Sequence, residues 1–176
     1  MPITRLNHAV LYVRDVEATR DFYERVLGFR TLQHVAGQRA FFQAPGSTND
    51  HDLGVFQIGS GAGASDAGRS TVGLYHLAWE VDTLRELDRI RGLLAERGAL
   101  VGATDHVTTK SLYAHDPDGL ELEVCWVLPA EVVTPALRAD AKADPRPRPL
   151  DLEAEKERYG ADTKGGIGVS ISVGAG

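Results

Sequence analysis

The sequence of 176 residues predicts an α+β fold built from two copies of one β-α-β-β-β module. The main observation is an internal repeat, in which residues 6–29, LNHAVLYVRDVEATRDFYERVLGF, match residues 74–99, LYHLAWEVDTLRELDRIRGLLAERGA. Both copies contain a His in a short strand-like run, then an acidic residue and a helical pattern that ends in Gly. A small unit that cannot bury its own apolar face stacks on its copy, so the repeat predicts paired modules.

Each copy opens with a strand. In the first copy, the even-numbered residues that begin with His8 share one face, and the odd-numbered residues share the other. The second copy repeats this alternation from His76. One face of each strand can therefore carry the His side chain while the other packs against helices.

A helix follows each strand. In the first copy Asp15 is a suitable N-cap, and Gly28 supplies the left-handed residue that ends the helix. In the second copy residues 83–86, TLRE, form a capping box, and Gly98 ends the helix. Apolar residues at helical spacing make the second helix amphipathic.

Three shorter strand-like runs follow each helix. They cover 29–35, 39–43 and 52–58 in the first copy, and 101–104, 111–115 and 120–128 in the second. The last two are joined by residues 116–119, DPDG, whose Pro presets φ and whose Gly tolerates positive φ. This order places module 1 at about 4–60 and module 2 at about 72–128.

These patterns make residues 1–128 resemble the vicinal oxygen chelate (VOC) superfamily, which includes glyoxalase I, extradiol dioxygenases, fosfomycin-resistance enzymes and bleomycin-binding proteins. The strings that carry the resemblance are LNHAVLYV with RDVEATRDFYERVLGF, YHLAWEVD and DPDGLELEVCW. The resemblance implies that the two modules form a half-open barrel around a metal site. We expect the barrel to close within one chain and a homodimer to form through other surfaces.

The resemblance also implies a metal site formed by His8, His76 and Glu123. In this family the carboxylate ligand lies four residues after the turn Gly, which is position 123 here. Spacing alone leaves Glu121 open, because it shares a strand face with Glu123. We prefer Glu123, since Glu121 is nearer the strand mouth. Two imidazoles and one carboxylate with open positions suit Fe(II) and oxygen activation, although Mn(II), Zn(II) or Ni(II) can occupy the same ligands.

Three more residues fall where the catechol 2,3-dioxygenase-like, extradiol branch of the superfamily would place them: His51, His106 and Tyr113. The resemblance implies an Fe(II)-dependent enzyme that cleaves the ring of a catechol-type aromatic with O2. His51 would be the acid/base, because imidazole titrates near neutral pH. His106 and Tyr113 would hydrogen-bond the substrate oxygen as its charge changes.

Two other functions remain open within this fold. A metal-dependent isomerase or lyase of the glyoxalase kind would usually need another carboxylate on the last strand of the first copy. That strand offers Asp52 and Gln57 but no Glu. A small-molecule (antibiotic) binding protein would typically lack the complete His-His-Glu set, and its metal content after purification would distinguish it.

Composition limits the partners and the compartment. The net charge of −6 gives no reason to expect nucleic acid or an anionic membrane as a partner. No apolar run approaches the roughly 20 residues that a membrane span needs. The N-terminus enters the first strand directly, and the single cysteine, Cys125, cannot form an internal disulfide. We therefore expect a cytoplasmic protein without a signal peptide.

The expected substrate is small and apolar or aromatic, because the candidate cavity-lining residues have that character. These candidates are Val10, Tyr12, Phe42, Phe56 and Trp126.

Residues 129–176 form a C-terminal extension of a different character. Residues 129–149 are rich in Ala, Pro, Asp and Arg, and they read as an extended connector. Residues 151–159 predict one short helix, and the end, GGIGVSISVGAG, contains a short alternating patch. Covering the cavity mouth or a dimer surface is a hypothesis for this extension.

Overall fold

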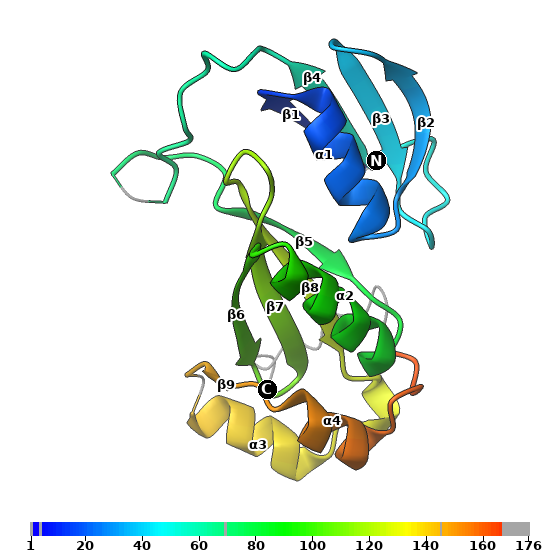
Figure 1. The fold of residues 1–176 in the computed structure, drawn as a ribbon. Coiled ribbons are helices and arrows are strands. Elements are labelled where there is room, and N and C mark those ends of the chain that lie inside the picture. Colours follow the sequence, from blue (N-terminus) through cyan, green and yellow to red (C-terminus); the bar gives the residue numbers. More distant parts are fainter. Residues whose placement is uncertain (1, 4, 69, 145, 167–176) are drawn as a thin grey trace. The chain divides into compact units, whose positions relative to one another are not determined.

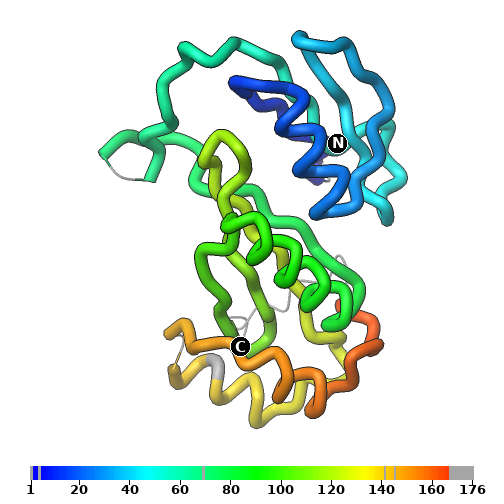
Figure 2. Tube along the Cα trace, in the orientation of Figure 1, coloured from blue at the N-terminus to red at the C-terminus, as the bar shows by residue number. Residues whose placement is uncertain are grey.

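The structure is a computed structural model that describes residues 2–3, 5–68, 70–144 and 146–166 (Figure 1). The chain divides into two compact units. Unit 1 comprises residues 1–71 and 116–120, and unit 2 comprises residues 72–115 and 121–176. Unit 1 combines one sheet with α1, and unit 2 combines one sheet with several helices whose coils can be followed along the chain in Figure 2, so the predicted α+β class is confirmed.

Unit 1 contains a four-stranded sheet in the order β1-β4-β3-β2, with one helix. β1 runs parallel to β4, and the other neighbours are antiparallel. The elements are β1 (Ala9–Val13), α1 (Val16–Arg25), β2 (Arg30–Val35), β3 (Arg39–Gln43) and β4 (Leu53–Gln57).

Unit 2 repeats this arrangement in the order β5-β8-β7-β6, with β9 added at the edge. β5 runs parallel to β8, as β1 does to β4. The predicted β-α-β-β-β repeat is therefore confirmed. The elements are β5 (His76–Glu80), α2 (Leu84–Glu96), β6 (Leu100–Asp105), β7 (Thr109–His115), β8 (Glu121–Val127) and β9 (Arg148–Pro149).

The helix ends follow the predicted capping residues. The side chain of Asp15 accepts hydrogen bonds from two backbone N–H groups of the first turn of α1. The side chain of Thr83 accepts one from the backbone N–H of Glu86 at 3.2 Å. Gly28 and Gly98 follow the two helices with φ of 73° and 64°, a region that glycine enters without steric cost.

The apolar core of each unit lies between its helix and one face of its sheet. Phe42 in β3 and Trp126 in β8 are completely buried there, so their prediction as cavity-lining residues is wrong. Each was assigned to the wrong face, because a shift of one residue in a strand turns the side chain to the other side. Val10 and Tyr12 are exposed on the opposite face of unit 1, with 51% and 72% of their surfaces accessible.

The C-terminal extension contains more regular structure than the sequence predicts. It forms η1 (Ala130–Val132), α3 (Pro135–Ala143), β9 and α4 (Leu152–Tyr159). An extended connector over 129–149 is therefore wrong for α3. Thr134 caps this helix by accepting from the backbone N–H of Leu137, and Pro135 occupies the first turn, where its missing N–H costs nothing.

The extension belongs to unit 2 and packs against its sheet and helix. Lys156 of α4 pairs with Asp88 of α2 at 2.7 Å, and the Trp126 indole N–H donates to the carbonyl of Thr163 at 3.2 Å. The short helix predicted over 151–159 corresponds to α4. The alternating patch lies largely outside the described residues. Within the described ranges, every helix is too short or too polar to cross a lipid bilayer.

Candidate metal site

His76 and Glu123 face each other in unit 2. β5 and β8 pair in parallel, so that His76 lies opposite Glu121 and Ala78 lies opposite Glu123. The Nε2 atom of His76 lies 3.2 Å from Oε2 of Glu123. Ser111 of the neighbouring β7 donates its hydroxyl to Oε1 of Glu123 at 2.5 Å. One carboxylate oxygen is therefore held in place while the other faces the imidazole.

Glu121 approaches the same imidazole from its other nitrogen. Its Oε1 lies 3.6 Å from Nδ1 of His76, and this buried nitrogen has no hydrogen-bond partner among the described residues. The side chain of Glu121 is 21% exposed, whereas that of Glu123 is 13% exposed. The shorter contact, the deeper position and the Ser111 hydrogen bond favour Glu123 over Glu121 as a metal ligand.

His106 and Tyr113 form a second pair in unit 2. His106 follows β6, and Tyr113 lies in β7 directly opposite Glu123. Nε2 of His106 lies 3.0 Å from the Tyr113 hydroxyl, and the rings of Tyr113 and His76 are 6.0 Å apart. Burial and the charge of Glu123 raise the pKa of Tyr113. The phenol therefore keeps its proton at neutral pH and can act as a hydrogen-bond donor.

His8 and His51 lie together in unit 1. His8 immediately precedes β1 and His51 lies two residues before β4, which places their ring centroids 4.5 Å apart. Nδ1 of His8 lies 2.7 Å from the side-chain oxygen of Asn7, and Nδ1 of His51 lies 3.3 Å from a carboxylate oxygen of Asp50. An oxygen close to Nδ1 favours the tautomer that carries its proton there, and in that tautomer the lone pair of Nε2 could bind a metal or a proton.

The structure thus brings the six predicted site residues together in two sets, one in each unit. Within the part of the chain that the structure describes, no cluster of three or more His, Cys, Asp or Glu side chains is arranged to hold a metal ion. The pair His76 and Glu123 nevertheless fits such an ion. Two ligand atoms that each lie about 2.1 Å from one metal ion, with their bonds at a right angle, are roughly 3 Å from each other. Nε2 of His76 and Oε2 of Glu123 are 3.2 Å apart.

Sequence reasoning missed Ser111, Asn7 and Asp50, which orient the predicted residues. Ser111 could have been found, because alternation along residues 111–115 places it on the same strand face as Tyr113. Asn7 and Asp50 are each adjacent in sequence to the histidine that they contact. Cys125 is buried, and burial raises the pKa of its thiol to about 12. The thiol is therefore protonated at neutral pH in the metal-free protein.

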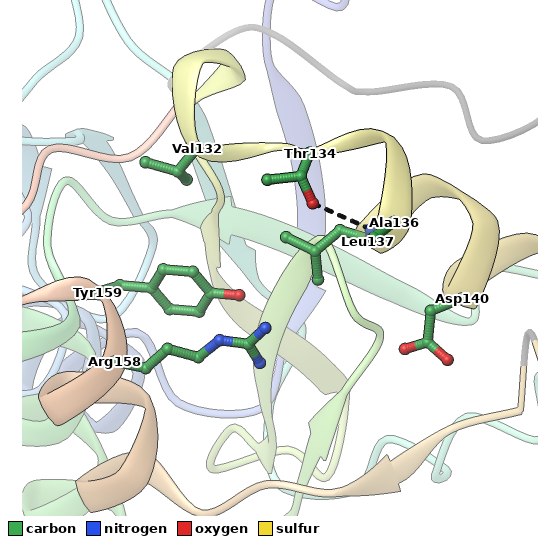
Figure 3. Close-up of a pocket in the computed structure, with 7 residues that line it drawn as sticks. All are labelled: Val132, Thr134, Ala136, Leu137, Asp140, Arg158 and Tyr159. Carbon is green, nitrogen blue, oxygen red and sulfur yellow. Dashed lines mark hydrogen bonds between the residues drawn. The ribbon is translucent and has the colours of Figure 1, made fainter.

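Two pockets lie away from these residues. A pocket of about 550 Å³ opens in the C-terminal extension, where Arg158 and Tyr159 of α4 face Leu137 of α3 (Figure 3). A smaller pocket of about 190 Å³ in unit 1 is lined in part by Tyr12, Arg14 and Asp118. Neither pocket is lined by any of the six predicted site residues.

Comparison with known families agrees with the topology. The family model described as "Glyoxalase/Bleomycin resistance protein/Dioxygenase superfamily" matches residues 5–124. The match covers the first repeat, the second repeat up to the middle of β8, and all six predicted site residues. The chain belongs to this superfamily.

A named relative also matches this sequence. The chain is 32% identical over 121 residues to a Bacillus subtilis protein named catechol-2,3-dioxygenase, and the match covers 69% of this chain and 41% of that protein. The chain thus spans about two-fifths of the length of this relative.

Solved structures share the fold. A glyoxylase/bleomycin resistance protein/dioxygenase domain from Frankia sp. EAN1pec is 23% identical with a TM-score of 0.59, covering 70% of this chain and 92% of that chain. A glyoxalase/dioxygenase from Nostoc punctiforme is 26% identical with a TM-score of 0.56, covering 69% and 89%. The predicted VOC fold is therefore confirmed.

Proposed function

We propose that this protein is a metal-dependent extradiol dioxygenase that cleaves the ring of a catechol-type aromatic with O2. The observation that carries the proposal is in unit 2, where the pair His76 and Glu123 shares one sheet surface with the pair His106 and Tyr113. A potential metal-binding pair thus lies beside two groups that can hydrogen-bond a substrate oxygen. The similarity to a protein named catechol-2,3-dioxygenase supports the same reaction.

The proposed metal ligands are His8, His76 and Glu123. Fe(II) is the proposed metal, and Mn(II), Zn(II) or Ni(II) can use the same donors. When bound, Fe(II) would supply the transfer of electrons between a catecholate and O2. Glu123 offers Oε2 because Ser111 holds its other oxygen, and His8 offers Nε2 because Asn7 accepts from its Nδ1.

The remaining residues bind the substrate and move protons. Tyr113 keeps its hydroxyl proton at neutral pH and donates to a catechol oxygen, while His106 holds the phenol through the 3.0 Å contact. His51 exchanges a proton at Nε2, because its Nδ1 faces Asp50. The hydrogen bond from the His51 backbone N–H to Asp50 lowers the pKa of Asp50 and keeps this carboxylate charged.

The glyoxalase-like alternative would use a further carboxylate from β4, and unit 1 offers none. Gly54 lies opposite Val10 of β1, in the register that Glu123 has with Ala78. Asp52 is engaged elsewhere, since its two oxygens accept from the backbone N–H of Ala44 and from two nearby side chains.

Gln57 is also occupied, because its side-chain oxygen accepts from the backbone N–H of Val16 at the start of α1. A simple antibiotic-binding role is disfavoured for a different reason. It would not require the close pairing of His76 with Glu123.

The test is anaerobic reconstitution with Fe(II), followed by oxygen uptake and absorbance scans on a panel of catechols. We expect uptake with a yellow ring-cleavage product, which is lost in His8→Ala and slowed in His51→Ala. No uptake with any catechol despite stoichiometric metal would favour the isomerase or lyase alternative. Light scattering on the same samples tests the expected homodimer, and cell fractionation tests the expected cytoplasmic location.

A further inference from the structure

We propose that the C-terminal extension positions His106 through a buried ion cluster formed by Lys110, Asp105 and Glu155. This inference rests on the proposed function, because it concerns the histidine that would support the Tyr113 hydroxyl. It assigns to the extension a role that differs from covering a cavity mouth.

The turn that carries His106 is strained. Val107, the next residue, has a φ of 70°, and it is the only non-glycine residue with positive φ among the residues that the structure describes. A β-branched residue in this region is a genuine outlier that persists only where its surroundings hold it. The contacts around the turn must therefore supply this restraint.

One carboxylate oxygen of Asp105 supplies it. The backbone N–H of Val107 donates to Oδ1 of Asp105 at 2.6 Å. The same oxygen accepts from Nζ of Lys110 at 2.5 Å. The turn is closed by further backbone bonds, in which His106 N–H donates to the carbonyl of Thr109 and Thr108 N–H donates to the carbonyl of His106, both at 2.9 Å. Asp105 thus ties the strained residue to a buried cation.

Lys110 is 1% exposed and is held from the other side by the extension. Its Nζ lies 3.0 Å from Oε2 of Glu155 in α4, and it lies 5.9 Å from the centre of the Tyr159 ring. A buried ammonium needs paired anions, because its desolvation is otherwise costly. Loss of Glu155 would leave Lys110 with Asp105 as its remaining carboxylate partner and would weaken the arrangement around Val107.

The extension also contacts this strand end through its backbone. In β9, Arg148 lies opposite Asp105 and Pro149 lies opposite Thr104. α4 is itself anchored, because Lys156 pairs with Asp88 and the ring of Tyr159 lies 5.9 Å from that of Trp126. Two separate parts of the extension therefore meet at the residue that restrains the His106 turn. Glu155 touches none of the proposed catalytic groups, so it acts as a positioning residue.

The first experiment measures His106 directly in the full-length, metal-free protein. Histidine ring ¹⁵N NMR reports the Nε2 environment, and a His106→Gln variant assigns the resonance. We expect Glu155→Gln to shift this resonance and to weaken the contact with Tyr113. Glu157→Gln, on the exposed side of the same helix, should leave the resonance at its wild-type position. An unchanged His106 resonance in folded Glu155→Gln would overturn the inference.

A second variant covers the case in which Glu155→Gln fails to fold. Lys110→Met combined with Glu155→Leu removes both the cation and its partner, and apolar replacement of a buried ion pair is often neutral or stabilising. This double variant should fold and still show the shifted His106 resonance. A resonance that stays at the wild-type position in the folded double variant contradicts the inference.

Turnover by the reconstituted holoenzyme separates this inference from the proposed function. We expect Glu155→Gln to lower kcat by roughly tenfold while KM for catechol and the metal content stay unchanged, as for other residues that orient a site from outside. A shifted resonance in a protein that turns over no catechol would refute the proposed function and leave the positioning role standing. Normal kcat with an unchanged resonance would refute the positioning role and leave the function standing.

Discussion

The two sheets share a topology but differ on the face that carries the histidines. In unit 2, Glu123 lies opposite Ala78 on one side and Tyr113 on the other. The corresponding residue of unit 1 is Gly54, which lies between Val10 and Phe41. The repeat therefore places a carboxylate and a phenol in one unit, where it places a glycine and a phenylalanine in the other.

The difference is more than the loss of one side chain. A Cβ atom added to Gly54 would lie 3.0 Å from the ring of Phe41, so the ring covers the space that a carboxylate would need. Val10, Tyr12 and Phe56 continue this apolar surface and are exposed. The buried faces, in contrast, are mainly apolar in both units, and Lys110 of β7 is a buried cation of unit 2. The comparison shows that two copies can keep the same strand topology and an apolar core while the residues on the other face of the sheet differ.

The largest expected effect lies in unit 2. We expect Glu123→Gln to weaken Fe(II) binding at least 100-fold and to lower kcat/KM on a catechol by about 1,000-fold, or about 4 kcal/mol, because the amide carries no charge. Glu121→Gln is the matched control on the same strand face and should retain stoichiometric metal. Metal analysis measures the change in Fe(II) binding, and oxygen uptake measures the change in kcat/KM. Equal loss in both variants would show that the two carboxylates share the role.

The next effect distinguishes the two faces of β3. Phe42 is completely buried, so Phe42→Ala should lower the free energy of unfolding by about 3 kcal/mol through lost burial and a new cavity. Phe41 is its neighbour on the opposite face of the strand, and Phe41→Ala should lower the free energy of unfolding by less than about 1 kcal/mol. Urea denaturation measures both. A larger cost at Phe41 would mean that its face is packed in solution.

A pH-dependent effect distinguishes two aspartates in loops of unit 1. Asp52 accepts hydrogen bonds at both carboxylate oxygens, whereas Asp116 accepts two backbone N–H bonds at Oδ1. Its buried Oδ2 has no partner within the described ranges. Burial is the main cause that raises the pKa of Asp116 from 3.8 to about 6. Stability should therefore fall as the pH rises from 4 to 6, because the unfolded state releases this proton first.

Asp116→Asn removes this ionisation. The stability of the variant relative to the wild type should increase by about 2 kcal/mol between pH 4 and pH 7, since each pKa unit corresponds to about 1.4 kcal/mol. Urea denaturation at several pH values measures the change. A difference that stays constant with pH would show that folding does not raise the pKa of Asp116.

Much of the fold could be predicted from the sequence, because its signals are local. The caps at Asp15 and Thr83 and the left-handed glycines fix where the helices begin and end, and the structure places them as expected. The α3 helix was missed because residues 129–149 were interpreted from their Ala, Pro, Asp and Arg content alone, and the capping residue Thr134 was not recognised. Phe42 and Trp126 were assigned to the wrong face, because an error of one residue in the alternating pattern moves a side chain to the opposite side of the sheet.

The candidate site could be predicted only in its primary residues. The side chains of His76 and Glu123 meet on one sheet face because the parallel pairing of β5 and β8 puts Glu123 opposite Ala78, two residues after His76. The link from Glu155 to the His106 turn depends on how α4 packs against the sheet, and no periodicity in the sequence reports that packing. The roles of all six candidate site residues remain predictions that the metal and turnover measurements test.

The smallest expected effect tests whether Phe41 excludes a side chain at Gly54. In the wild type, Gly54→Ala should destabilise unit 1 by about 0.5–1 kcal/mol, because the new Cβ would meet the Phe41 ring at 3.0 Å. In a Phe41→Ala background the same change should stabilise the unit by a similar amount, since alanine reduces the conformational entropy of the unfolded chain relative to glycine. A double-mutant cycle measured by urea denaturation isolates this coupling. Equal effects of Gly54→Ala in both backgrounds would show that the ring moves aside freely, in which case the open face of unit 1 has room for a larger residue at the position where unit 2 carries Glu123.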